Sequence, residues 1–288
     1  MSIDVLQEKI RKTKNPSVLE LELSVSDLPP KFSQNGEGYA AFCRELMEAM
    51  QGILPAVRIC FTSFVLLGHD GLYHLSETLK KARELGYYVL LDAPEILSPG
   101  AAKTVAASIL GEGSLYPCDG LVIFGYLGSD VIKPFLPYCK QEKKDLFVVA
   151  RTANKSAPEL QDLLAGSRLV HVAAADHVNR YGSDTAGKNG YTNVGVMAGA
   201  SSAESLRNLR TKYPKMFLLV DGYDYPNANA KNCSNAFDQF GHGAAVCGGT
   251  GITCAWKDGE ADGEDYLTSA KAAAERMKKN LTRYVTIL

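Results

Sequence analysis

Short apolar runs rich in β-branched residues alternate along this chain with segments whose apolar residues recur at helical spacing. The expected strands are 18–25, 57–61, 87–92, 120–124, 146–151, 194–198, 216–221 and 243–247. The expected helices are 3–12, 39–51, 71–85, 99–110, 130–140, 157–164, 170–181, 202–213, 233–240 and a last one from Ala261 to about Tyr284. This alternation predicts an α/β protein with a parallel sheet.

The number of strands distinguishes between the two common parallel architectures. Eight strands, each followed by a helix, within 288 residues favour a closed (β/α)₈ barrel, the TIM barrel. An open doubly wound sheet has fewer strands and usually a glycine fingerprint after the first one. Here residues 24–30 read SVSDLPP, with no glycine, and no linker-like segment divides the chain. We therefore predict a single barrel domain over residues 1–288.

The composition excludes several classes of function. With 31 basic and 32 acidic side chains the net charge is −1, which gives no electrostatic footprint for nucleic acid. No apolar run approaches the roughly 18 residues of a membrane helix, and residues 1–16 lack a signal-peptide core. The seven cysteines form no CxxC pair, as is typical of free thiols in a reducing compartment. We expect a cytoplasmic protein without nucleic-acid or membrane partners.

In such a barrel the chemistry lies where the strands end, at the C-terminal face. The residues expected there are Glu22, Arg58, Asp92, Phe124 to Tyr126, Arg151 to Asn154, Asp221 to Asp224, and Gly248 to Gly251. The run Gly248-Gly249-Thr250-Gly251 after the eighth strand can cradle a phosphate, because glycines let backbone N–H groups point at an anion. A tight turn without a ligand is the alternative for this loop.

Two further strand ends carry polar side chains. Asp92 is a candidate general base or hydrogen-bond acceptor, or else a cap for the next helix. After the seventh strand, Asp221, Tyr223, Asp224 and Tyr225 precede an asparagine-rich stretch. That spacing is not a calcium loop, so we interpret it as a loop that recognises a ligand through hydrogen bonds. The five histidines show no HxH or HExxH spacing, and no metal site is predicted.

Several stretches, taken together, resemble the orotidine 5′-phosphate decarboxylase family in its longer bacterial form. They are Lys14-Asn15-Pro16, Gly125-Tyr126-Leu127-Gly128-Ser129-Asp130, Arg151-Thr152-Ala153-Asn154, Glu159-Leu160-Gln161-Asp162, Gly190-Tyr191-Thr192-Asn193-Val194-Gly195, Gly222-Tyr223, Gly251-Ile252 and Ala255-Trp256-Lys257. They follow one another in order over almost the whole chain. The resemblance implies a barrel dimer with active sites at the subunit interface, which decarboxylates orotidine 5′-phosphate to uridine 5′-phosphate without a cofactor.

The resemblance also implies that the catalytic signature is replaced. The family's Asp-x-Lys-x-x-Asp corresponds to residues 92–97, which read DAPEIL. Asp92 is retained, but Pro94 stands for the lysine that protonates the carbanion and Leu97 for the second aspartate. Proline carries no acidic proton, and leucine cannot hold a lysine by charge. Arg58 stands for the lysine after the second strand, with a guanidinium that does not deprotonate.

The ligand contacts that the family makes are altered as well. Thr250 stands for the phosphate-binding arginine and Pro226 for the phosphate-binding glutamine. Phe124 stands for an asparagine, and the family's Gly-Leu-Asp-Pro after the first strand reads ELEL in residues 20–23. The scaffold, Asp92, the Thr152/Asn154 pair and the glycine loop remain. Loss of the proton donor, its partner and both phosphate side chains should abolish most of the rate.

We therefore predict a family member that does not catalyse this decarboxylation. It would bind a nucleotide-like or phosphorylated small molecule, or serve as a regulatory or partner subunit, as a homodimer or with an intact family member. The expected ligand-binding residues are Thr152, Asn154, Tyr223, Asp224, Gly248, Gly249, Thr250 and Gly251. One alternative is an enzyme of altered chemistry with Asp92, Glu95 or Glu22 as acid or base and Arg58 as anion anchor. Another is orotidine 5′-phosphate decarboxylase itself.

Overall fold

A closed parallel barrel forms the centre of the computed structural model, which describes residues 2–258 and 263–288. Within that part of the chain, eight strands follow one another around the barrel in the order β1-β10-β9-β8-β5-β4-β3-β2. The strands are β1 Ser17–Leu21, β2 Ala56–Cys60, β3 Tyr88–Asp92, β4 Gly120–Phe124, β5 Asp145–Arg151, β8 Thr192–Gly199, β9 Met216–Asp221 and β10 Ala244–Gly248. The predicted (β/α)₈ barrel is confirmed.

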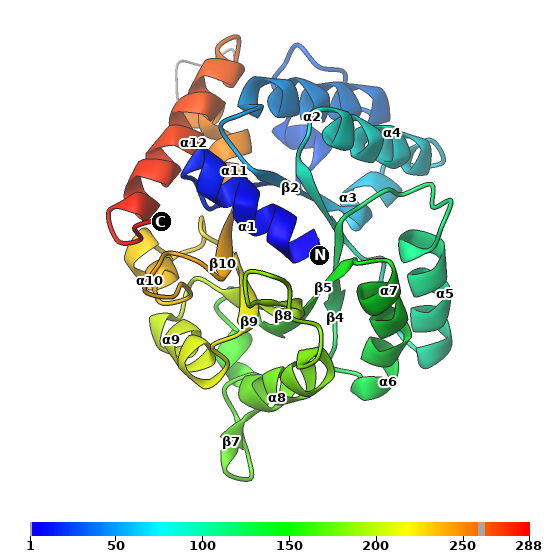
Figure 1. The fold of residues 1–288 in the computed structure, drawn as a ribbon. Helices are drawn as coiled ribbons and strands as arrows, with labels where there is room; N and C mark the ends of the chain where they lie inside the picture. Colours follow the sequence, from blue (N-terminus) through cyan, green and yellow to red (C-terminus); the bar gives the residue numbers. More distant parts are fainter. Residues whose placement is uncertain (1, 259–262) are drawn as a thin grey trace.

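Helices surround the strands on the outside of the barrel, except for α1, which crosses one end of it (Figure 1). They are α1 Ser2–Thr13, α2 Gly36–Met50, α3 Phe61–Val65, α4 Gly71–Glu84, α5 Pro99–Leu110, α6 Ser129–Ile132, α7 Leu136–Gln141, α8 Val170–Gly182, α9 Ala203–Lys212, α10 Ala230–Ser234, α11 Thr250–Thr253 and α12 Tyr266–Thr282. None of these helices in the described residues has the length and apolar character that a membrane span requires.

Helix α1 closes the N-terminal end of the barrel, where it crosses in front of the strands in Figure 1. The backbone N–H of Ser2 donates to the carbonyl of Lys143, just before β5 begins. The apolar face of the helix, Ile3, Leu6 and Ile10, is buried. Phe147 in β5 is fully buried as well and packs edge-on against Phe217 of β9. Because this end is closed and packed, the C-terminal end is the one left for a ligand.

Most deviations from the predicted elements follow from local hydrogen bonds or proline. Strand β1 ends at Leu21 rather than at residue 25, because Ser24 and Asp27 form a capping box that begins a 3₁₀ turn, η1 Val25–Asp27. The expected helix 130–140 is divided into α6, the 3₁₀ segment η2 Lys133–Phe135 and α7, since its prolines lack the N–H that a helix interior needs.

Two expected helices were wrong in type or extent. Segment 157–164 forms only the 3₁₀ turn η3 Ala157–Glu159, because the chain then enters a two-stranded hairpin, β6 Leu164–Ala165 with β7 Arg168–Leu169. Helix α10 begins three residues before the expected 233–240, where Asn229 caps it, and ends at Ser234. The expected start of the last helix at Ala261 lies outside the described residues, and α12 begins at Tyr266. A final 3₁₀ segment, η4 Ala255–Asp258, follows α11.

Candidate functional site

A buried arginine bound by three carboxylates occupies the C-terminal end of the barrel. The Nη1 atom of Arg58 in β2 lies 2.7 Å from Glu20 Oε1 and 2.5 Å from Asp221 Oδ1. Its Nε and Nη2 atoms donate to both oxygens of Asp92, at 2.8 and 2.9 Å. The Arg58 side chain is only 6% exposed, so the guanidinium is saturated by the protein itself. The altered-chemistry alternative made Arg58 an anion anchor for a ligand, but its N–H groups are already bound by the protein's own carboxylates.

Strand register brings these charges together. Glu20 in β1 lies directly opposite Arg58 in β2, and Asp92 and Asp221 are the last residues of β3 and β9. Burial raises the pKa of Glu20 to about 8, although Arg58 opposes the rise, and the neighbouring aspartates add to it. Burial also raises the pKa of Glu22, again against Arg58. The cluster thus holds one carboxyl group, that of Glu20, that takes up a proton near neutral pH.

The raised pKa of Glu20 predicts a pH-dependent stability. Because its pKa rises on folding from 4.5 to about 8, the group favours the native state fully below pH 4.5 and loses that contribution as the pH rises toward 8. Glu20→Gln keeps a neutral side chain at every pH. We expect its melting temperature, relative to the unmodified protein, to increase between pH 5 and pH 8 by a few degrees, since about 1 kcal/mol corresponds to about 2–4 °C at this size.

Scanning calorimetry at several pH values measures this difference. The matched control is Glu95→Gln, the same substitution at an exposed position in the loop after β3. The difference in melting temperature between Glu95→Gln and the unmodified protein should not change with pH. A Glu20→Gln difference that is equally flat would contradict the protonation of Glu20 in the native state.

Beside the cluster lies a cavity of about 310 Å³. Its lining consists of Glu20, Glu22, Asp221, Gly222, Asp224, Tyr225, Pro226, Gly249 and Thr250. Four of these residues are carboxylic acids, and among the described residues that line the cavity there is no lysine, arginine or histidine. The cavity therefore presents hydrogen-bond acceptors and negative charge, together with one aromatic ring from Tyr225.

The glycine loop after β10 forms one wall of this cavity, but an internal carboxylate already contacts it. The backbone N–H of Gly249 donates to Asp224 Oδ2 at 2.8 Å. A Cβ atom at Gly251 would lie 2.2 Å from Asp224 Oδ1, so only glycine permits this approach. Gly248 faces the other way, since a Cβ there would meet Met277 at 2.6 Å. Gly249 and Thr250 are thus the cavity-facing residues of the predicted loop.

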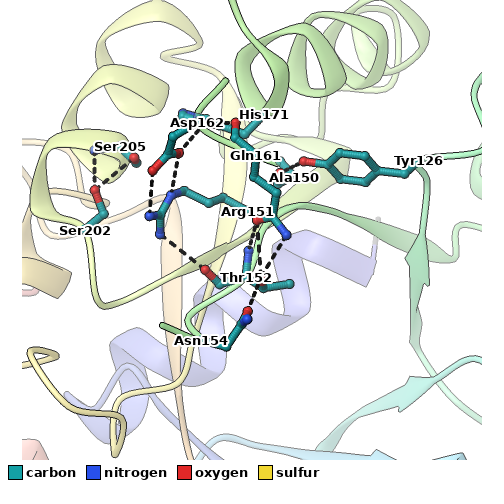
Figure 2. A network of polar contacts seen from close by, with 10 residues as sticks. All are labelled: Tyr126, Ala150, Arg151, Thr152, Asn154, Gln161, Asp162, His171, Ser202 and Ser205. Atoms are coloured by element: carbon teal, nitrogen blue, oxygen red, sulfur yellow. Dashed lines mark hydrogen bonds and ion pairs between the residues drawn. The ribbon is translucent and has the colours of Figure 1, made fainter. Parts of the chain in front are cut away.

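The Thr152/Asn154 pair belongs to a separate hydrogen-bonded network after β5 (Figure 2). The Thr152 hydroxyl donates to Asn154 Oδ1 at 2.5 Å, and the Thr152 N–H donates to Gln161 Oε1 at 2.7 Å. Beside them Arg151 makes a two-point ion pair with Asp162, with both contacts at 2.9 Å. These polar groups bind one another, and neither Thr152 nor Asn154 lines the cavity.

Other expected site residues lie apart from the cavity. Tyr223 lines a different depression, together with Asn280 and Arg283. Tyr225 instead lines the cavity, because the chain turns back where the N–H of Tyr225 donates to the carbonyl of Gly222, just after β9. Glu95 is exposed, three residues beyond Asp92.

One group of side chains has the spacing of possible metal ligands: Asp92, Glu22 and Cys60 bring three ligand-type atoms within 4.8 Å of one another. Both Asp92 oxygens already accept hydrogen bonds from Arg58, which competes with a metal ion.

The sequence prediction missed Glu20 as a site residue, and it placed Asp221 and Tyr225 in a ligand-recognising loop without naming either as a binding residue. Charged residues inside otherwise apolar strands were the available signal, as Glu20 within SVLEL and Arg58 within AVRIC. A charge buried in a barrel strand needs a partner, so each of these predicts the other. The position of Tyr225 depends on the turn at Gly222, where φ is +70°, and carries no comparable signal.

Two bacterial proteins with the same name are similar to this chain over most of its length. A protein of Rhodopirellula baltica named orotidine 5′-phosphate decarboxylase is 30% identical over 251 residues, which cover 84% of this chain and 83% of that protein. One of Clostridium perfringens with the same name is 28% identical over 286 residues, with 98% of both chains covered. No protein-family model matches the chain.

Solved structures agree in fold. The orotidine monophosphate decarboxylase of Leishmania donovani has a TM-score of 0.74 at 22% identity, with 98% of each chain covered. That of Plasmodium berghei has a TM-score of 0.76 at 14% identity, also with 98% of each chain covered. The chain is thus a single (β/α)₈ barrel with a small cavity at its C-terminal mouth. It belongs to the orotidine 5′-phosphate decarboxylase family.

Proposed function

We propose that this chain is a non-decarboxylating member of its family that binds an uncharged, nucleoside-like small molecule at the mouth of the barrel. The observation that carries the proposal is the charge of the cavity. Four carboxylic acids line it, and the nearby Arg58 is bound by Glu20, Asp92 and Asp221. The cavity offers many acceptors for the hydroxyl groups of a sugar, and the described residues that line it include no cationic side chain for a phosphate.

Electrostatics favours the uncharged ligand over its phosphate ester. Two like charges about 4 Å apart repel by about 4 kcal/mol at an effective dielectric constant of about 20. A phosphate beside Asp224 and Asp221 would meet this repulsion without compensation from an arginine or lysine in the lining. Of the ligands predicted from the sequence, the nucleoside-like one therefore fits better than the phosphorylated one.

Calorimetric titration with uridine and uridine 5′-phosphate tests the proposal. We expect uridine, or another nucleoside in a panel of four, to bind at least about tenfold more tightly than its 5′-phosphate, which corresponds to about 1.4 kcal/mol. Tyr225→Ala should weaken nucleoside binding about tenfold, since stacking of a base on an aromatic side chain contributes about 1–3 kcal/mol.

Tyr223→Ala is the matched control, because it removes the same side chain two positions away, outside the cavity. It should leave the affinity unchanged. Tighter binding of the phosphate ester than of the nucleoside, or no binding of any nucleoside at millimolar concentration, would contradict the proposal.

An enzyme of altered chemistry is the second candidate, and one observation favours it. Burial raises the pKa of Glu20 to about 8, and the side chain lines the cavity. A carboxyl group that titrates near neutral pH beside a ligand cavity is suited to general acid–base catalysis. Burial also raises the pKa of Glu22, which lines the same cavity.

A further inference from the structure

The carboxylate of Asp224 occupies the place where the glycine loop would receive an anion. Its Oδ2 atom accepts the N–H of Gly249 at 2.8 Å, and its Oδ1 atom lies against the face of Gly251 where a side chain would otherwise be. An external phosphate therefore finds this backbone donor in use and a negative charge directly beside it.

We propose that Asp224 is the specificity-determining residue of the cavity: it acts as a built-in substitute for a ligand's anion and excludes phosphate groups from the glycine loop. This inference deepens the proposed function, because it names the residue that makes the cavity select uncharged ligands. The other acidic residues of the lining add negative charge but have a different position. Only Asp224 among them accepts the Gly249 N–H.

The backbone around Asp224 directs its side chain to this position. Gly222, the residue after β9, is in the left-handed region with φ of +70°, and the N–H of Tyr225 closes the turn by donating to the Gly222 carbonyl at 3.1 Å. A Cβ at Gly222 would lie 2.3 Å from the Cβ of Ala153, so the turn needs glycine. The turn carries Asp224 from the end of β9 to the start of the loop after the neighbouring strand β10.

Glycines on the opposite side complete the arrangement. A Cβ at Gly251 would lie 2.2 Å from Asp224 Oδ1, and a Cβ at Gly249 would lie 3.0 Å from Glu20 Oε2. The absence of side chains at both positions lets two carboxyl groups approach the loop. The same absence would admit a phosphate once the Asp224 carboxylate is removed, because the N–H of Gly249 would then be available.

Titration with inorganic phosphate, at low ionic strength and neutral pH, tests the role of Asp224. The unmodified protein should bind phosphate too weakly to saturate at millimolar concentration. Asp224→Ala uncovers the donor and removes the charge, and we expect its affinity for phosphate to rise at least about tenfold. Asp224→Asn removes the charge but keeps an oxygen that can accept the Gly249 N–H, so its gain should be smaller.

Glu22→Gln is the control for charge alone, since it neutralises another carboxylate of the same cavity without uncovering the loop. Its affinity for phosphate should rise clearly less than that of Asp224→Ala. Equal phosphate affinity in Asp224→Ala and the unmodified protein, with similar melting temperatures, would overturn the inference, and so would an equal gain in Glu22→Gln. If Asp224→Ala does not fold, a gain in Asp224→Asn above that of Glu22→Gln supports the inference, and its absence overturns it.

The probe separates this inference from the proposed function. Inorganic phosphate carries no base or sugar, so its binding to Asp224→Ala does not depend on nucleoside recognition. A phosphate gain in the variant without nucleoside binding by the unmodified protein would leave the role of Asp224 intact and contradict the proposed ligand. Nucleoside binding by the unmodified protein, without any gain in phosphate affinity in the variant, would support the proposed ligand and overturn the role of Asp224.

Discussion

Purified protein is expected to leave orotidine 5′-phosphate unconverted under conditions in which the Clostridium perfringens relative consumes it. We expect kcat/KM to be lower than in that relative by at least about five orders of magnitude. A general acid contributes about 10²–10⁴ in rate, and one lost electrostatic contact to the reacting group costs about 10²–10³. Here a proton donor and several such contacts are replaced together.

The positions of the replacing residues give the physical reason. Pro94, where the resemblance implies the lysine, has no proton to deliver, and Leu97, where it implies the second aspartate, is 74% exposed on the rim. The substrate carries two anionic groups, a carboxylate and a phosphate. Both would enter a cavity whose lining has four carboxylic acids and no basic side chain among the described residues.

Spectrophotometric turnover at micromolar enzyme, from a host lacking its own decarboxylase, measures the rate. The double variant Pro94→Lys/Leu97→Asp is expected to remain at least about a thousandfold below the relative, because the phosphate would still meet Asp224 at the glycine loop. Turnover by the unmodified protein within about a hundredfold of the relative would contradict the proposed loss of decarboxylation.

The barrel could be predicted from the sequence because its signals are local and repeated. Each strand is a short apolar run between polar helices, and all eight occur where that pattern predicts them. Segment 157–164 was predicted wrongly as a helix because its backbone follows nonlocal partners. The carbonyl of Gln161 accepts the N–H of His171, and Leu163 accepts the N–H of Val170, which holds the hairpin instead of a helix.

The candidate site was predictable only in part. Strand ends identified Arg58, Asp92 and Asp224 as neighbours at one face, since this follows from parallel strands alone. What each side chain binds depends on register and rotamer. Arg58 is directly opposite Glu20 and therefore pairs with carboxylates of the protein. Asp224 binds the glycine loop because the turn at Gly222 aims it there, and no sequence pattern specifies that direction.

Substitution of Arg58 by methionine is expected to be the most destabilising single change at the mouth of the barrel. It leaves Glu20, Asp92 and Asp221 facing one another without their shared cation. Removal of one partner from a buried ion pair costs about 3–5 kcal/mol, because the remaining charge is uncompensated. Urea unfolding at pH 7 measures the free energy of unfolding of the variant and of the unmodified protein.

The pH dependence identifies the cause of this loss. If carboxylate repulsion destabilises Arg58→Met, the loss of stability should shrink as the pH falls from 8 to 5, because Glu20, whose pKa burial raises to about 8, then takes up a proton in the native state. Adding Asp92→Asn to the variant should recover part of the stability at pH 7 in the same way.

Arg151→Met is the matched control, since this equally buried arginine pairs with one carboxylate, Asp162, which is 28% exposed. We expect a smaller loss there and a weaker dependence on pH. An Arg58→Met loss below about 1 kcal/mol, the range of an exposed pair, would show that the cluster does not depend on this cation.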